Sequence, residues 1–195
     1  MTIEATFNSL LANFGALREA LQNLRLTVVE DRPLRNGVLI IDRMGDAIDD
    51  LIGWLEEGSE AAGRASKAVV HPIDGQRAIH DLSQVNERFL KLEYNFFWGL
   101  ASYPQVRDLT KLGTSRGREW RAWSDSVKVA LDQTGHAMNE LQRALLATWQ
   151  ELAERVGAGS VSVQTTNIGQ QISTAAAEAA ETRHGTREHT RDGMT

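Results

Sequence analysis

Hydrophobic residues recur every three or four positions through most of residues 1–157, with polar and charged residues between them. This spacing is the period of an α-helix, in which residues three and four apart share one face. The clearest runs cover residues 3–24, 38–55, 79–96 and 120–156. They predict long amphipathic helices, because none of these runs alternates with the two-residue period of a strand.

The predicted helices are separated by prolines and glycines, at Pro33, Gly58, Pro72, Pro104 and Gly113. Gly58 predicts the end of the second helix, followed by a short alanine-rich helix over 59–69. Asp74 is a good N-cap for the third helix, and a short segment follows Pro104. The pattern therefore predicts an all-α fold, an antiparallel four-helix bundle with short connecting helices.

The character of the chain changes after the fourth helical run. Residues 156–177 carry no charge and lie between Arg155 and Glu178, and β-branched residues alternate with polar ones around Val161 and Val163. A β-prone segment in a helical chain has no partner strand, so it stays solvated, extends another sheet or stacks with copies of itself. Its alternating β-branched and polar residues, with glutamines and asparagine and without charge or proline, favour extending another sheet or stacking with copies of itself; a flexible polar tail is the alternative.

We therefore divide the chain into a helical bundle over 1–157, an uncharged β-prone assembly motif over 158–173, and a tail over 174–195. The tail is alanine-rich and then polar, and we expect it to be disordered. The expected assembly contacts come from the apolar and amide residues of the motif, Val161, Val163, Gln164, Asn167, Ile168, Gln170, Gln171 and Ile172.

Two apolar features suggest further contacts. Phe96, Phe97 and Trp98 are consecutive, so on a helix they span about 200° and cannot all face one interface. Either the segment after Pro104 covers them, or Phe97 and Trp98 form an exposed patch for a partner or membrane. Residues 5–17 are uncharged and amphipathic; besides forming a core helix, such a segment can enter a bilayer interface. The residues that would contact the membrane are Phe7, Leu10, Leu11 and Phe14.

Charge is distributed unevenly along the 195 residues, whose net charge is −5. Residues 30–60 hold nine acidic against three basic residues, a net charge of −6, and residues 104–128 hold six basic against three acidic, a net charge of +3. These segments either steer self-association or a partner, or meet within one bundle. The acidic balance also argues against general nucleic-acid binding.

The sequence offers little for catalysis. It has no cysteine, which excludes disulfides and thiolate metal sites. A di-metal bundle needs a Glu-x-x-His on each of two helices, and the only one in the chain runs from Glu181 to His184. We expect no enzyme activity and no cofactor, and keep a metal-dependent enzyme built on His80, His136 and Glu140 as the third alternative. We see no signal peptide and no 18-residue apolar stretch, which predicts a cytoplasmic protein.

A helical bundle followed by the sequence GSVSVQTTNIGQQI at 159–172 resembles the bacterial cell-death effectors that carry amyloid signalling motifs. Their helical domain is of the bell type, similar in layout to fungal HeLo domains. The resemblance implies a motif templated by a matching motif on a receptor ATPase, and a bundle that then attacks the membrane through its N-terminal helix. This chain departs from the family in continuing beyond the motif and in having a less apolar N-terminal helix.

Together these observations predict a non-enzymatic bacterial protein that self-assembles or recruits a partner through its motif, and that associates with a membrane on activation. The alternative is a helical adaptor or assembly subunit that binds a partner helix through Phe97 and Trp98.

Overall fold

The computed structural model describes residues 2–33, 39–70, 74–97 and 117–156. Its helical elements are α1 (Ile3–Arg25), the π-helical turn η1 (Leu26–Glu30), α2 (Leu39–Val70), α3 (Gly75–Tyr94) and α5 (Arg118–Val156). No strand occurs in these described ranges. The predicted all-α class is therefore confirmed.

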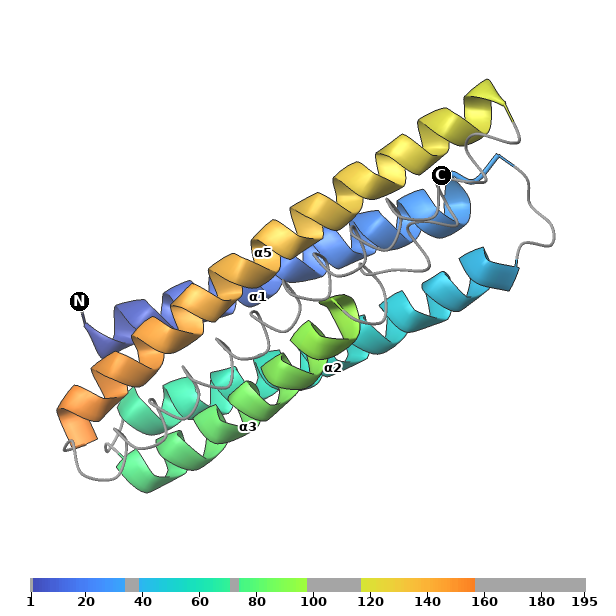
Figure 1. The fold of residues 1–195 in the computed structure, drawn as a ribbon. Helices are drawn as coiled ribbons and strands as arrows, with labels where there is room; N and C mark the ends of the chain where they lie inside the picture. Colours follow the sequence, from blue (N-terminus) through green and yellow to red (C-terminus); the bar gives the residue numbers. More distant parts are fainter. Residues whose placement is uncertain (1, 34–38, 71–73, 98–116, 157–195) are drawn as a thin grey trace, which may run out of the picture.

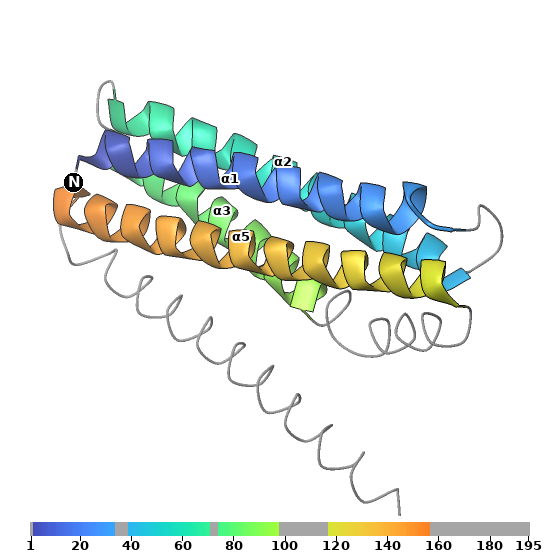
Figure 2. The same cartoon turned by 90° about the horizontal axis from the view of Figure 1, so that it is seen from above.

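The long helices lie side by side along one axis (Figure 1; Figure 2 shows the same arrangement from above). In Figure 1, α1 and α3 run in one direction, and α2 and α5 run in the other. α1 packs against both α2 and α5, α2 also packs against α3, and α3 has fewer contacts with α5. Each helix is therefore antiparallel to those it packs against.

The core follows the predicted helical period. On α1, the buried apolar residues alternate between steps of three and four positions, which is a heptad pattern. They are Ile3, Phe7, Leu10, Phe14, Leu17, Leu21 and Leu24. The same alternation runs along α3 through Ala78, Leu82, Val85, Phe89 and Leu92 to Phe96. On α5, Trp120, Trp123 and Val127 are all buried, so they belong to the core rather than to a binding surface.

The starts of the helices show local reasons for their position. Thr2 caps α1, because its Oγ1 accepts a hydrogen bond from the backbone N–H of Ala5 at 3.3 Å. Asp74 caps α3 as predicted, with its Oδ1 accepting from the N–H of Arg77 at 3.1 Å. Gly117 precedes α5 with a φ of 102°, a conformation that favours glycine.

The expected break at Gly58 is wrong. α2 continues from Leu39 to Val70, so there is no separate helix over 59–69. Gly58 is buried where α1 and α3 both approach α2: a Cβ there would lie 3.1 Å from Cε1 of Phe14 and 3.5 Å from Cβ of Arg88. Glycine at this position permits close packing instead of ending the helix. The short segment expected after Pro104 lies outside the described residues.

Candidate functional site

The residues expected to contact a membrane lie on the inner face of α1. Phe7 and Leu10 are fully buried, Phe14 is 4% exposed, and Leu11 is partly buried against the core. The outer face over residues 5–16 carries no charge and consists of small and amide residues, namely Ala5, Asn8, Ser9, Ala12, Gly15 and Ala16. In this fold α1 therefore uses its apolar face for packing and presents an uncharged outer face.

Three ion pairs connect α1 and the residues just after it to α2. They are Arg18–Glu56 at 2.6 Å, Arg25–Asp49 at 2.5 Å and Arg32–Asp42 at 2.8 Å. From one pair to the next, the arginine number rises by seven and the number of the acidic residue falls by seven. All three pairs therefore share one antiparallel register. The hydrogen bond from Arg25 to Asp49 raises the pKa of the Arg25 guanidinium.

The contact between α2 and α3 has a register of its own. The ammonium of Lys91 lies 4.3 Å from the ring centre of Trp54, Arg88 pairs with Glu57 at 2.8 Å, and Arg64 pairs with Asp81 at 3.3 Å. From each of these pairs to the next, the residue number on α2 rises by the same amount as the residue number on α3 falls. A single register therefore governs this antiparallel pair too.

Asp81 is a buried carboxylate within this contact. Its side chain is 7% exposed, and its Oδ2 has no hydrogen-bond partner in the described part of the chain. Arg64, which pairs with its Oδ1, also donates to Oε1 of Gln84 at 2.9 Å, and the amide of Gln84 lies 3.1 Å from Nε2 of His80. The network thus links a buried acid to the exposed His80.

α5 is attached to α1 by side chains that donate to backbone carbonyls. Nε1 of Trp123 donates to the carbonyl of Thr27 in η1 at 2.7 Å. Further along, the hydroxyls of Thr134 and Thr148 bond within α5 to the carbonyls of Ala130 and Ala144, both at 2.8 Å, and also approach the carbonyls of Ala20 and Thr6 on α1 at 3.4 and 3.3 Å. A hydroxyl on so short a side chain reaches another backbone only when the two helices are close. These bonds therefore mark a tight α1–α5 contact along most of α1.

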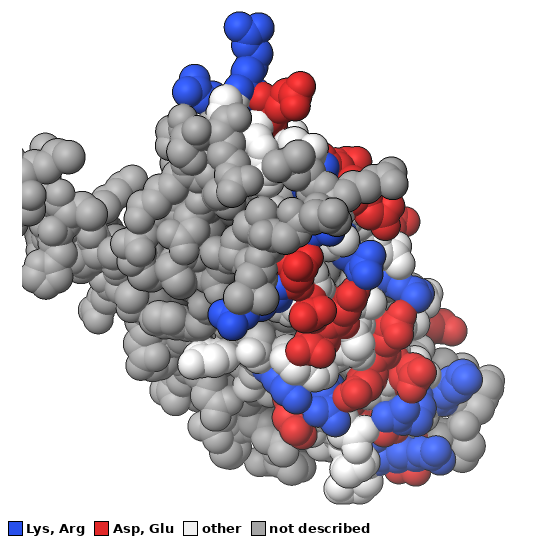
Figure 3. Space-filling view, turned by 90° about the vertical axis from the view of Figure 1, so that its right-hand side faces the viewer, with Lys and Arg blue, Asp and Glu red and all other residues white. Residues whose placement is uncertain are grey.

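Charges on α2 are only partly matched within the molecule. Asp42, Asp49, Glu56 and Glu57 pair with arginines, whereas Asp46, Asp50 and Glu60 have no ion-pair partner among the described residues. Figure 3 views the molecule from the end where α2 and α5 begin, and shows acidic side chains on the described surface with basic ones lying among them and projecting above them. Part of the acidic segment thus meets bases within the chain, which is one of the two outcomes expected. None of the described bases of 117–128 is among its ion-pair partners.

Glu93 is a second buried acid. It lies on α3 with 8% exposure, within one helical turn of Phe89, Phe96 and Phe97. Burial raises the pKa of its carboxyl group to about 7. Glu93 can therefore take up a proton near neutral pH while exposed acids stay ionised.

The aromatic segment at the end of α3 is only partly described. Phe96 is 1% exposed and meets the half-buried ring of Phe97 edge-on, with 5.1 Å between ring centres. Trp98 lies outside the described residues. The exposed aromatic residue of this region is Tyr94, at 62%.

The candidate metal ligands do not form a cluster. His80 and His136 are both exposed, and Glu140 lies 3.9 Å from His136 but also pairs with Arg143. No group of three metal-ligating side chains occurs in the part of the chain that the structure describes. Among the same residues, no helix has the length and apolar character needed to cross a membrane.

The assembly residues expected at 158–173, Val161 to Ile172, lie outside the described residues, and so does the tail over 174–195. α5 ends at Val156, which is also the first residue of the uncharged stretch.

Sequence reasoning missed Glu93 and the ion-pair register. Glu93 follows Leu92 directly and lies four residues after Phe89, so its place beside the apolar stripe was a usable signal. The seven-residue spacing of Arg18, Arg25 and Arg32 was a signal for the register.

Comparison with protein-family models, with curated proteins and with solved structures found no match to this chain.

Proposed function

We propose that this chain is a non-enzymatic helical protein that self-assembles, or recruits a protein partner, through the uncharged motif over 158–173. The sharper form of the proposal is a membrane-targeting effector in bacterial defence or cell-death signalling, with a receptor ATPase as the recruiting partner. In this proposal the described helices form one antiparallel four-helix bundle. The fixed registers between α1 and α2 and between α2 and α3 support that arrangement.

One observation carries the proposal: the uncharged stretch over 156–177 begins where α5 ends. Up to that residue, the apolar positions follow a helical period and are buried in a shared core. Beyond it, the period changes to two, and the composition becomes that of a segment that stacks with copies of itself. A helical region that buries its own apolar residues leaves such a segment to find its partner outside the molecule.

The membrane part of the proposal is supported by α1. Between Glu4 and Arg18 this helix carries no charge on either face, so its transfer to a bilayer interface would bury no charged group. Its apolar residues are buried in the described fold. Membrane contact therefore requires α1 to leave α2 and α5, and we propose that motif assembly triggers this release.

Self-assembly is tested with a proline in the motif of the full chain. Val163→Pro removes a backbone donor from any cross-β stack, so fibres that bind thioflavin and show cross-β spacings should be lost. Helicity measured by circular dichroism should not change. Thr190→Pro, outside the motif, is the matched control and should form fibres like the natural chain. A natural chain that stays monomeric and free of fibres at high concentration contradicts the proposal.

Membrane contact is tested by leakage of anionic vesicles after fibre seeding. Ala12→Glu places a charge on the exposed outer face of α1, where it should leave the fold intact but lower leakage several-fold. Ala122→Glu adds the same charge to an exposed site on α5 and is the control. Equal leakage from both variants would exclude α1 as the inserted element.

The two alternatives have simple tests of their own. If the chain is an adaptor that acts through Phe97 and Trp98, a chain ending at Gly157 keeps its oligomeric state in light scattering at about 1 M NaCl, whereas our proposal expects the oligomer to disappear there. If it is a metal-dependent enzyme, elemental analysis of the purified full chain finds stoichiometric metal.

A further inference from the structure

Two aromatic side chains reach the outer surface between α2 and α3, one exposed and one packed at the edge of the core. Tyr94 is 62% exposed on α3, and half-buried Trp54 on α2 lies under the ammonium group of Lys91, one helical turn before Tyr94. Tyrosine and tryptophan are enriched at the centres of protein interfaces. We call Trp54, Lys91 and Tyr94 the aromatic patch.

Two exposed acids lie within one helical turn of the aromatic patch, Asp50 before Trp54 on α2 and Glu87 before Lys91 on α3. Asp46, Asp50 and Glu60 are exposed on α2 without an ion-pair partner among the described residues. On α3, the side chain of Glu87 is 76% exposed, and its ion-pair contact is with the adjacent Arg88, at 4.0 Å. A partner that covers the aromatic patch would therefore gain from carrying basic groups.

The start of α5 supplies such groups in the same chain. Arg118 and Arg121 are exposed in its first turns, and neither has an ion-pair partner among the described residues. Cations at a helix N-terminus oppose the helix dipole, so this placement is unfavourable for α5 itself. Glu119 in the same turn is favourable there, but the two arginines oppose the dipole of their own helix.

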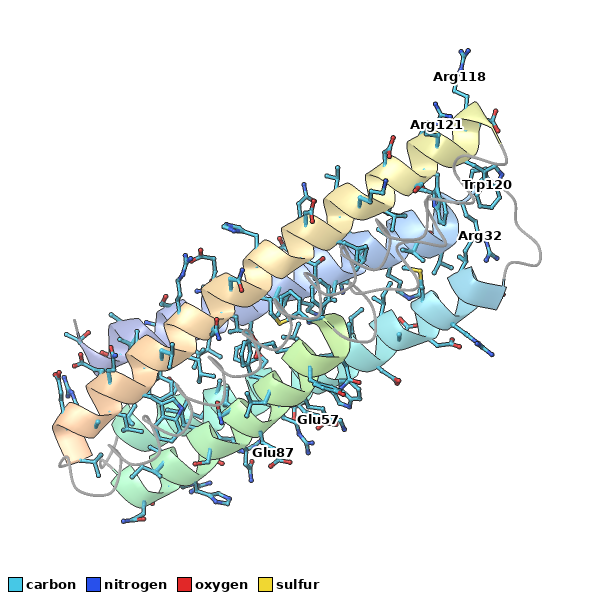
Figure 4. The ribbon with its side chains drawn as sticks, in the orientation of Figure 1. Arg32, Glu57, Glu87, Arg118, Trp120 and Arg121 are labelled. Carbon is cyan, nitrogen blue, oxygen red and sulfur yellow. The ribbon has the colours of Figure 1, made fainter. Side chains whose placement is uncertain are left out.

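The two surfaces cannot meet within one molecule. Figure 4 shows Arg118 and Arg121 projecting from the tip of α5, whereas Glu57 and Glu87 lie on the outer side of α2 and α3, across the molecule. α1 packs against both α2 and α5, and in Figure 4 Arg118 and Arg121 point away from Glu57 and Glu87. Any contact between them must join two copies of the chain.

We infer that the start of α5 in one copy docks on the aromatic patch of a second copy, with Arg118 and Arg121 facing the acids around the patch. The contact joins different surfaces, so it repeats from copy to copy and builds open chains unless the rotation closes a ring. The inference rests on the proposed self-assembly and adds a contact through the helical region. By holding copies together it raises the local concentration of their uncharged motifs.

The test separates this contact from assembly by the motif. Full-length Val163→Pro, in which stacking of the motif is blocked, should still associate at low salt in sedimentation velocity. It should become monomeric near 1 M NaCl, where the Debye length falls to about 3 Å. Stacking of an uncharged motif is not lost in salt, so the two assemblies respond differently. A Val163→Pro chain that is monomeric at low salt overturns the inference and leaves the proposed function standing.

Charge reversal then identifies the surfaces, again in the Val163→Pro background. Arg118→Glu with Arg121→Glu should weaken association at least about tenfold without unfolding α5, because acids suit a helix N-terminus. Arg77→Glu with Arg143→Glu makes the same change in net charge at exposed sites elsewhere and is the control. Equal weakening in both double variants would show a general charge effect and overturn the inference.

A charge swap completes the design. Asp50→Arg with Glu87→Arg reverses the acidic side of the contact and should also prevent association alone. An equal mixture of this variant with Arg118→Glu/Arg121→Glu pairs opposite charges again, so association should return to within a fewfold of the Val163→Pro chain. Failure of the mixture to associate, with both variants folded, contradicts the pairing of these two surfaces.

Discussion

The carboxyl group of Glu93 lies in the apolar layer of α3, where burial raises its pKa from 4.5 to about 7. The folded protein holds this proton at pH values where the unfolded chain has released it. The contribution of Glu93 to stability is therefore fully present below pH 4.5 and is lost as the pH rises through 7. A pKa difference of this size corresponds to no more than about 3 kcal/mol.

We predict that Glu93→Gln flattens this part of the pH dependence, because the amide stays neutral at every pH in the range. The measurement is the free energy of unfolding in urea between pH 4.5 and 8, compared with the natural chain. Glu87→Gln, at an exposed position on the same helix, should leave the slope unchanged. An unchanged slope in Glu93→Gln would show that Glu93 titrates normally in the folded state.

Residue identity was enough to place the core but not the polar contacts inside it. Trp120 and Trp123 were expected in the core from their place on the apolar stripe, and both are buried. Gly58 was misread, because a glycine that ends a helix and a glycine that allows close packing look alike in sequence. What distinguishes them is the ring of Phe14, which comes from another helix.

Two buried tryptophans on α5 show what holds this helix to its neighbours. Trp123 donates its indole N–H to the carbonyl of Thr27, whereas the indole N–H of Trp149 is buried without a partner. Both are almost fully buried, so substitution by phenylalanine removes the same volume at each site. Only the first substitution also removes a hydrogen bond.

We predict that Trp123→Phe lowers the free energy of unfolding by about 1 kcal/mol more than Trp149→Phe does. Hydrogen exchange should also become faster at the amide of Asp31, which donates to Leu26 at the end of η1, because the carbonyl of Thr27 loses its anchor. The second variant serves as the control for lost volume. Equal destabilisation by the two would indicate that the Trp123 hydrogen bond contributes nothing net.

At the level of elements, the helical period predicted the described helices because each buries one continuous stripe. The partners of each stripe were not predictable, since helices with similar apolar faces can pack in several orders. Polar contacts decide which helices pack together. Arginines on α1 pair with acids on α2, and threonine hydroxyls on α5 approach carbonyls of α1. Their pairing depends on the lengths of the connections as well as on spacing within each helix.

Across the whole molecule, the registers between the helices restrict how α1 can be positioned against its neighbours. The pairs Arg18–Glu56 and Arg25–Asp49 fix α1 on α2, and Thr134–Ala20 and Thr148–Thr6 fix it on α5. Each ion pair alone contributes little to stability, because the side chains are exposed and water screens their charges. Together with the apolar stripe, these pairs leave α1 one position in which every contact forms.

We predict that one alanine inserted after Ala20 destabilises the fold by more than about 4 kcal/mol. The insertion rotates the rest of α1 by about 100°, which moves Leu21, Leu24 and Val28 out of the core. The same alanine inserted before Thr2 should have little effect, because it lies ahead of the first turn. Thermal unfolding followed by circular dichroism distinguishes the two, and similar melting temperatures would argue against a fixed register.

The shared registers also limit how this protein can change in size. A seven-residue segment added to α1 restores the stripe and the spacing of its arginines, but it leaves α2 and α5 too short unless they gain matching segments. Any lengthening of the helical region must therefore come as a coordinated set of seven-residue blocks in neighbouring helices. The length of the helical region can therefore change only in steps of seven residues, and the distance between its two ends is fixed for a given set of helices.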